Sequence, residues 1–250
     1  MNSEIENTLQ KEIDDLRREV TLLRGISEEG LPTFQYSKIR DSDLKSLVTI
    51  ERNIKDATKF DRWFDRDREI DSSLKAFLEN LIDENASLID SYNEEDLKIN
   101  VLAPLIGRVK FKSFKNEFRA FYELPFLYKT DRFIFNGTVD FVVSQGLVES
   151  KEPYFFIQQF KRSEEFGNPR PQLLAELISA VELNLWKTIK GAYIIGGNWH
   201  FVILEKLEKN TYQYFVSKNF DSTRLDDLID IYKNLVYVKQ EIITMLSSTP

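Results

Sequence analysis

Three polar residues interrupt two apolar stretches whose residue types are typical of β-strands. Asp140 lies in TVDFVVS, and Gln159 and Lys161 lie in YFFIQQFK. Because side chains two positions apart share one face of a strand, Gln159 and Lys161 point the same way. A carboxylate beside an amide oxygen and an ammonium can hold a divalent cation, orient a water molecule and stabilise charge on a phosphate. The structural alternative is that Asp140 ends a buried segment and Lys161 extends to water.

The composition excludes most other catalytic chemistry. The 250 residues include no cysteine and one histidine, His200, which removes thiol nucleophiles, thiolate metal sites and mechanisms that need two imidazoles. His200 lies in GGNWHFVIL and the chain has no G-x-S-x-G motif, so we interpret this histidine as a packed or partly exposed structural residue. The chain also lacks Walker A and G-x-G-x-x-G motifs, which argues against a loop that cradles phosphate.

The charge is acidic overall but unevenly distributed. The formal net charge is −7, whereas residues 106–170 hold 11 Lys and Arg against 8 Asp and Glu. Part of this excess is a short basic run: Arg108, Lys110, Lys112, Lys115 and Arg119. We interpret the run as a surface for a nucleic-acid backbone, and the alternative is a solvated basic turn.

The N-terminus has the heptad pattern of a short coiled coil, predicted over residues 1–25. Its apolar core positions are Leu9, Ile13, Leu16, Val20 and Leu23. Because so short a coil is marginal alone, we expect it to form a homodimer or to bind a partner protein; the alternative is that it packs on the body of the domain. The chain has no long apolar run and no apolar stretch at its start, so we expect no membrane contact and a cytoplasmic protein.

Residues 26–92 are predicted to form a linker and a helical region. Glu28 to Tyr36, with a glycine and a proline, has the composition of a linker. Two amphipathic helices are then expected, from Ser42 to about Lys59 and from Ser72 to about Ser91, because apolar residues recur at spacings of three and four.

Residues 93–250 are predicted to form a domain with a mixed central sheet. Asn93 is the expected cap of a helix from Glu94 to about Ile106, in which Pro104 either kinks the helix or marks its last turn. Three strands follow, and the third has apolar residues on both faces, as in a central strand. An amphipathic helix from Pro171 to Lys187, further strands and a closing helix from Leu225 to Leu246 complete an α/β fold whose sheet is flanked by helices.

This order of elements, with Asp140 followed by Gln159-x-Lys161 and by a helix that contains Gln172, resembles the PD-(D/E)XK nuclease superfamily. The resemblance covers roughly residues 93–205 and is closest to a largely uncharacterised prokaryotic group within that superfamily. It implies the restriction-endonuclease-like fold. The motif is short and degenerate, so its specificity comes from the strands on which it lies.

The resemblance also implies roles for individual residues. Asp140 matches the first aspartate of the motif, a metal ligand, and Lys161 matches its lysine, which positions the attacking water and stabilises negative charge. Gln159 replaces the usual acid; its amide offers an oxygen without charge, so we expect weaker metal binding. Gln172 is similar to a glutamine on the following helix of several branches, and its alternative is an ordinary polar residue at a helix start.

One further acid is expected to complete the metal site. Glu123 is the first candidate because strand pairing is expected to bring it near Asp140, and an acid between Tyr122 and Leu124 is out of place. Glu95 is the second candidate. Glu94, which we consider with it, is better explained as a partner of the positive end of the helix.

We therefore expect a nuclease, a hydrolase of phosphodiester bonds in DNA that depends on Mg²⁺ or Mn²⁺, with RNA remaining an open substrate. The resemblance implies a setting in defence or DNA processing. The coiled coil would pair two copies or attach one to a partner. The alternative is a nuclease-like module without catalysis, which acts as a scaffold or partner-binding subunit through its coiled coil.

Overall fold

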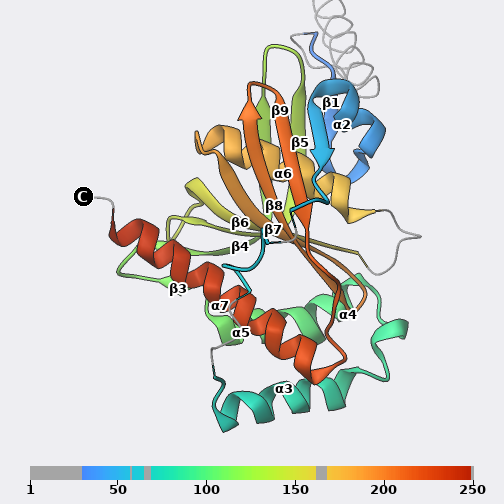
Figure 1. Ribbon diagram of the computed structural model, residues 1–250, viewed down its shortest axis with the longest axis vertical. Helices are drawn as coiled ribbons and strands as arrows, with labels where there is room; N and C mark the ends of the chain where they lie inside the picture. Colours follow the sequence, from blue (N-terminus) through green and yellow to red (C-terminus); the bar gives the residue numbers. More distant parts are fainter. Residues whose placement is uncertain (1–29, 57, 65–68, 162–167, 249–250) are drawn as a thin grey trace, which may run out of the picture.

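The computed structural model describes residues 30–56, 58–64, 69–161 and 168–248, and the predicted coiled coil, residues 1–25, lies outside them. The described residues form an open mixed sheet with helices on both faces (Figure 1), which confirms the α/β class. The strands are β1 (Thr33–Gln35), β2 (Thr49–Arg52), β3 (Lys112–Ser113), β4 (Phe118–Lys129), β5 (Ile134–Gln145), β6 (Lys151–Lys161), β7 (Thr188–Ile195), β8 (Asn198–Glu208), β9 (Thr211–Val216) and β10 (Phe220–Asp221). The helices are η1 (Tyr36–Lys38), α2 (Asp41–Leu47), α3 (Ser72–Asn85), η2 (Ile89–Ser91), α4 (Glu94–Leu97), η3 (Lys98–Leu102), α5 (Ala103–Val109), α6 (Pro169–Leu183) and α7 (Leu225–Ser247).

The strands lie in the order β2-β9-β8-β7-β6-β5-β4-β3, with β1 beside β5 and β10 beside β8. β4, β5 and β6 are successive antiparallel strands, and β7 runs parallel to β6 after the crossover through α6. The three strands and the helix that the sequence predicts here are confirmed. β6 has a neighbour on each side and is buried from Phe155 to Phe160, so it is the central strand that its two apolar faces predict.

β5 and β6 separate within the sheet close to Asp140. Their ladder ends at the pair Phe141 and Gln158. Beyond that point β5 continues beside β4, and β6 continues beside β7 as far as Lys161. β1 pairs with the part of β5 that has left β6. The polar residues of the sequence motif therefore lie at a fork in the sheet, where regular strand pairing stops.

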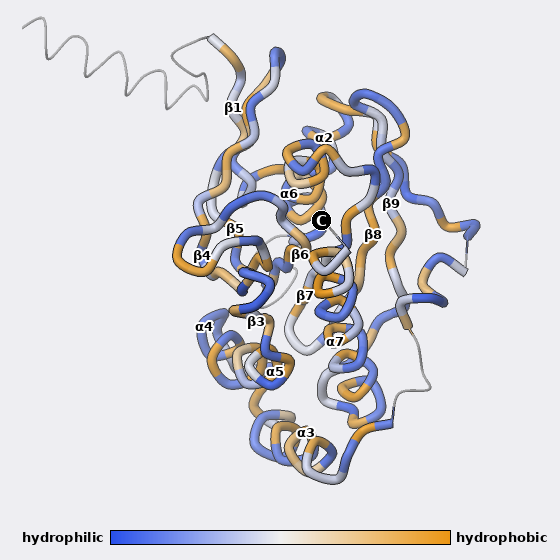
Figure 2. The backbone as a smooth tube through the Cα atoms, turned by 90° about the vertical axis from the view of Figure 1, so that its left-hand side faces the viewer, coloured by the Kyte–Doolittle hydropathy of each residue, from blue (hydrophilic) through white to orange (hydrophobic). Residues whose placement is uncertain are grey.

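Two apolar clusters hold the fold together, one on each face of the sheet. One contains residues of α6, η1 and α2, and the other contains residues of α3, α5 and α7. Figure 2 shows hydrophobic residues concentrated in the central strands and in α6. None of the described helices combines the length and the apolar character that crossing a membrane requires.

α6 is buried on all sides, although its sequence predicts one apolar stripe. Every residue from Pro171 to Val181 is buried. η1 and α2 pack against α6 from outside the sheet, and the Tyr36 hydroxyl donates a hydrogen bond to Ser179 Oγ at 2.8 Å. The segment before residue 93, which also supplies β1 and β2, therefore completes the core around α6 and the sheet.

Two predictions for that segment are wrong. The helix expected from Ser42 to Lys59 ends at Leu47 and is followed by β2, because β-branched residues at its start find a parallel partner in β9. The expected linker contains β1, whose three residues pair with β5. The second predicted helix is confirmed as α3, which ends at Asn85 and is followed by the single turn η2.

The helix before the sheet begins as predicted and has an irregular centre. The Asn93 side chain accepts a hydrogen bond from the Asp96 backbone amide at 2.9 Å, which confirms the cap. The π-helical turn η3 separates α4 from α5, and Pro104 lies in the first turn of α5. Since proline donates no hydrogen bond and its ring excludes the carbonyl four residues earlier, it accounts for the widened turn before it. Lys98 begins that turn.

Candidate functional site

Asp140 is a buried carboxyl group at the fork between β5 and β6. Its side chain is 8% exposed, and its Oδ2 accepts a hydrogen bond from the Phe160 backbone amide at 3.2 Å. The β5–β6 ladder ends before Phe160, so the Phe160 amide donates to the Asp140 carboxylate in place of a backbone carbonyl of β5. Burial raises the pKa of Asp140 to about 6, although the Phe160 amide and the charges of Lys98 and Lys161 act in the opposite direction.

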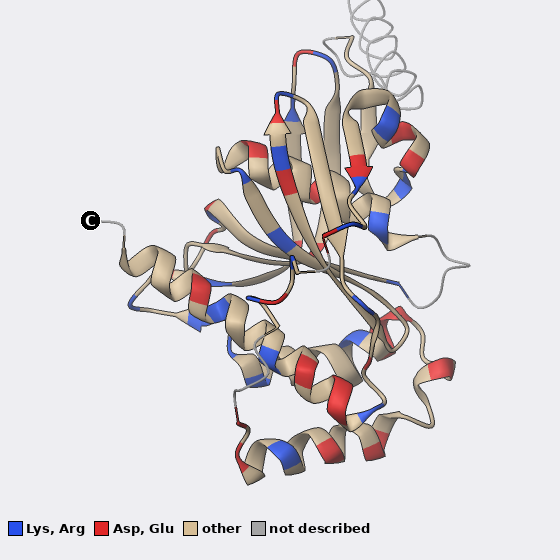
Figure 3. Ribbon diagram, in the orientation of Figure 1, with Lys and Arg blue, Asp and Glu red and all other residues tan. Residues whose placement is uncertain are grey.

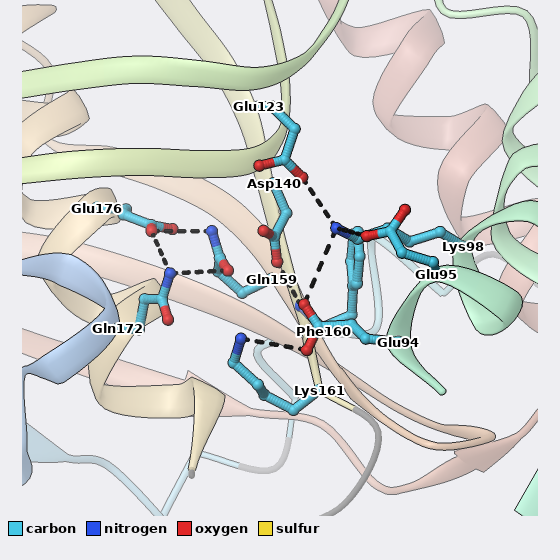
Figure 4. Close-up of polar contacts among 10 residues, drawn as sticks. All are labelled: Glu94, Glu95, Lys98, Glu123, Asp140, Gln159, Phe160, Lys161, Gln172 and Glu176. Carbon is cyan, nitrogen blue, oxygen red and sulfur yellow. Dashed lines mark hydrogen bonds and ion pairs between the residues drawn. The ribbon is translucent and has the colours of Figure 1, made fainter. Parts of the chain in front are cut away.

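Gln159 faces α6 and is completely buried. Its Nε2 donates a hydrogen bond to Glu176 Oε1 at 2.8 Å, and its Oε1 accepts one from Gln172 Nε2 at 2.9 Å. Gln172 Nε2 also donates to Glu176 Oε1 at 3.1 Å. Gln159 and Gln172 thus lie together, and their amides form a closed network with Glu176 beside Asp140 (Figure 4).

Glu176 is a member of this network that the sequence analysis missed. It is completely buried, and its Oε2 has no hydrogen-bond partner among the described residues. Burial, reinforced by the negative charge of Asp140, raises the pKa of Glu176 well above its usual value. The signal was present in the sequence: Glu176 is the one acid in the apolar stretch LLAELISA and lies one helical turn after Gln172.

The Glu176 network predicts different results for two substitutions. Glu176→Gln keeps an oxygen that accepts both amides, so its free energy of unfolding should stay within about 1 kcal/mol of the wild type. Glu176→Leu leaves the Gln159 and Gln172 amides unpaired in the core and should lose about 2 kcal/mol. Urea unfolding at pH 7 measures both. Equal losses in the two variants would show that the hydrogen bonds to Glu176 do not stabilise the fold.

Lys161 lies at the end of β6, where it contacts the start of α4. Its Nζ is 3.4 Å from Glu94 Oε2, and its side chain is 19% exposed. Glu94 is therefore part of the site, whereas the sequence analysis assigned it to the helix dipole. Asp140 on β5 and Gln159 and Lys161 on β6 all lie at the fork (Figure 4).

Lys98 is the second residue that the sequence analysis missed. Its Nζ lies 2.9 Å from Glu95 Oε1, 2.9 Å from Glu123 Oε1 and 3.9 Å from Glu94 Oε1. The same ammonium lies 4.8 Å from the centre of the Phe160 ring. Burial alone would lower the pKa of Lys98, but the hydrogen bonds to Glu123 and Glu95 and the charge of Asp140 raise it overall, so this side chain is a cation at neutral pH.

Glu123 lies opposite Asp140 in the β4–β5 ladder, as the sequence analysis expects. The pairs on either side are Tyr122 with Phe141 and Leu124 with Val139, and the ladder skips the pair between them. Glu123 has a φ of 47°, a backbone conformation that is costly for a residue other than glycine. β4 is therefore distorted at Glu123, the residue whose carboxylate contacts Lys98.

The donor atoms around the fork suit a hard divalent cation. They are carboxylate oxygens of Asp140, Glu95 and Glu123 and the amide oxygen of Gln159, the donor types that Mg²⁺ and Mn²⁺ prefer. In the described part of the chain, however, no three carboxylates converge on a point suited to a metal ion. Glu95 and Glu123 instead converge on the Lys98 ammonium. The types of donor atom therefore fit a divalent ion, but Glu95 and Glu123 bind the Lys98 ammonium in this structure.

The basic run lies away from this cluster. Arg119 pairs with Ser144, four residues along β5 from Asp140 or about 13 Å. Its guanidinium donates to the backbone oxygens of Leu147, Ala120 and Val148, so it holds the turn that follows β5. The four other members of the run, which lie on or near α5 and β3, are exposed: Arg108, Lys110, Lys112 and Lys115.

His200 lies on β8, where its ring stacks on that of Tyr193 at 4.7 Å between centroids. This packing agrees with the structural role that the sequence analysis expects.

No protein-family model and no curated protein matches this chain. The fold and the site define its class: an α/β protein whose mixed sheet forks at a buried carboxyl, with two lysines and three glutamates around the fork.

Proposed function

We propose that this protein is a metal-dependent nuclease of the PD-(D/E)XK type, which hydrolyses phosphodiester bonds in DNA. The observation that carries the proposal is the position of the motif. Asp140 lies on β5 and Gln159 and Lys161 lie on β6, at the point where the two strands diverge. Because the β5–β6 ladder ends there, the space beside Asp140 is occupied by side chains and not by backbone pairing.

The order of the elements supports the same proposal. A helix (α4 to α5) precedes three antiparallel strands, α6 follows, and β7 returns parallel to β6. This is the order on which the resemblance to the superfamily and its restriction-endonuclease-like fold rests. The right-handed rule for such crossovers limits how α6 can pack, and it brings Gln172 and Glu176 to the face of the sheet that carries Gln159.

In this proposal, Asp140, Gln159 and Glu123 or Glu95 hold Mg²⁺ or Mn²⁺. The ion would polarise a phosphate oxygen and lower the pKa of a bound water. Lys161 is charged and partly exposed, so it can orient a water molecule and stabilise negative charge on the phosphate. Glu94 holds the Lys161 ammonium at the end of the strand.

The exposed lysines around β3 are the surface that we propose for the phosphate backbone, at a distance from the reacting atoms. Figure 3 shows basic and acidic residues interspersed over the molecule, with acidic residues along α3 and α7. Since such contacts are electrostatic, DNA binding through Lys110, Lys112 and Lys115 would weaken as salt rises.

The test is cleavage by the purified full chain. Supercoiled plasmid, single-stranded DNA and single-stranded RNA are incubated with Mg²⁺, with Mn²⁺ or with EDTA, beside an Asp140→Ala variant prepared in the same way. We expect metal-dependent cleavage of DNA that is absent from the EDTA and Asp140→Ala samples. Cleavage that persists equally in the variant reveals a contaminant, and an inert wild type on all three substrates overturns the proposal.

A second candidate is a nuclease-like module without catalysis, which binds partners through the predicted coiled coil. Two observations favour it: the Gln159 amide is completely buried in hydrogen bonds to α6, and the acids of the site are paired with Lys98. An inert wild type that forms a stable dimer or complex would support this candidate.

A further inference from the structure

Lys98 is placed where a bound cation would be expected. Its ammonium contacts two carboxylates that come from different elements, Glu95 on α4 and Glu123 on β4, both at 2.9 Å. Glu94 lies 3.9 Å away on its other side. Figure 4 shows these three side chains directed toward Lys98, with Asp140 close by.

The arrangement around Lys98 is not that of a surface ion pair. The lysine side chain is 19% exposed, whereas the Glu95 and Glu123 side chains are 70% and 58% exposed. The ammonium itself lies over the Phe160 ring, 4.8 Å from its centre, whereas the acids that it contacts extend toward water. Glu95 and Glu123 are thus accessible to solvent, whereas the Lys98 ammonium between them is largely buried.

The backbone on both sides of Lys98 is unusual. Lys98 begins the π-helical turn η3, and Glu123 has a φ of 47°. Widened helical turns and positive φ values at residues other than glycine cost energy and occur preferentially at functional sites. Both distortions belong to residues that form the 2.9 Å contact between Lys98 and Glu123.

We propose that Lys98 is a built-in competitor for the metal site: its ammonium occupies the carboxylates in the metal-free protein and leaves them when a divalent cation binds. This inference rests on the proposed function, because it concerns the metal of the same site. Lys98 would set the metal affinity and keep the site closed at low metal concentration. Its flexible stem of four carbons lets the ammonium swing outward without a change in the backbone.

Direct metal binding tests the proposal without an activity measurement. The probe is Mn²⁺, with free ion quantified by electron paramagnetic resonance in titrations of the full chain. Lys98→Met keeps an apolar side chain of similar size and removes the charge. We expect it to bind Mn²⁺ about tenfold more tightly than the wild type, since changes next to a metal site typically alter affinity by about 10- to 100-fold. Lys75→Met on α3, which removes the exposed Lys75–Glu79 pair, is the control for net charge and should bind as the wild type does.

A second measurement uses the wild type and does not depend on how the variant folds. Mass spectrometry follows the reaction of Lys98 with an amine-selective reagent, with and without Mn²⁺. We expect Mn²⁺ to speed labelling of Lys98 and to leave labelling of Lys75 unchanged, because the ion releases the ammonium from its carboxylates.

The outcomes separate this inference from the function on which it rests. If the wild type binds Mn²⁺ and Lys98→Met binds it equally or more weakly, or if Mn²⁺ leaves Lys98 labelling unchanged, Lys98 is not a competitor and the inference is overturned while the proposed metal site stands. If neither protein binds Mn²⁺, the metal-dependent function is overturned together with the inference. Binding by Lys98→Met alone would support the inference in its strongest form.

Discussion

Replacing Lys161 with methionine should lower the rate of phosphodiester cleavage by about 10²- to 10³-fold, the effect usual for loss of one group that stabilises developing charge. Lys161 is the basic residue of the motif at the end of β6, and its ammonium is held 3.4 Å from Glu94 Oε2. Methionine keeps an unbranched side chain of nearly the same length and removes the charge. The loss should therefore appear in the rate of cleavage under saturating DNA and Mn²⁺, with little change in the melting temperature.

Lys206→Met is the matched control for this substitution. Lys206 also lies on a strand of the sheet, is 27% exposed and forms an ion pair with Glu182 at 2.7 Å. Its pair contacts no residue of the fork that we describe, so its loss should leave the cleavage rate unchanged. Equal rates for Lys161→Met and the wild type would remove Lys161 from the catalytic assignment.

Local sequence signals predicted the elements that carry the motif. Asn93 marks the start of its helix because its polar side chain accepts a hydrogen bond from a backbone amide of the first turn. The aromatic and β-branched residues of β4 to β6 favour strands over helices. β2 was missed because Thr49 to Arg52 form a strand only through β9, which lies about 160 residues later. The residues around Thr49 do not reveal that a strand so distant in the sequence will pair with them.

The residues of the site likewise divide into those that local sequence predicts and those that depend on packing. Asp140, Gln159 and Lys161 were predicted because they interrupt apolar strands, and the interruption is visible in the sequence. Lys98 gave no such signal: a lysine near two glutamates on a helix is the ordinary pattern of an exposed surface. Only the packing of that helix against β4 and β6 brings Lys98 to Glu123 and Phe160.

The burial of Gln159 also follows from packing rather than from the motif. The spacing of Gln159 and Lys161 predicts a shared face, but it does not show that α6 covers one residue and leaves the other at its edge. α6 was expected to have one apolar stripe, whereas η1 and α2 also pack against it and it is buried on all sides. The amide network is therefore a part of the core as much as a part of the site.

Asp140→Asn should abolish metal-dependent cleavage and, at the same time, stabilise the protein by up to about 3 kcal/mol at pH 8. The asparagine oxygen can still accept the Phe160 amide, but the residue brings no charge for a cation. The gain in stability has a separate cause. Burial raises the pKa of Asp140 to about 6, so the folded protein bears a cost whenever this carboxyl is ionised inside it.

The raised pKa of Asp140 determines the pH range over which the stability of the wild type changes relative to Asp140→Asn. Well below pH 4 Asp140 is protonated in the folded and unfolded states, so Asp140→Asn and the wild type should differ little in stability. Between pH 4 and about 6 the unfolded chain ionises first, and the wild type loses stability as the pH rises. Above that range both states are ionised and the difference is constant. Urea unfolding of both proteins at pH 4, 5, 6 and 8 measures this curve.

A difference between the two proteins that stays flat from pH 4 to 8 would show that the Asp140 carboxyl is not destabilised by burial. A divalent cation provides the complementary measurement, because it favours the ionised carboxylate. Mn²⁺ should bind the wild type less tightly by up to about tenfold for each pH unit below about 6, and it should stabilise the wild type but not Asp140→Asn. A buried carboxyl that costs stability when it is ionised and recovers that cost when it binds a cation is thus expected of a metal ligand, whereas a purely structural Asp140 would show the first effect without the second.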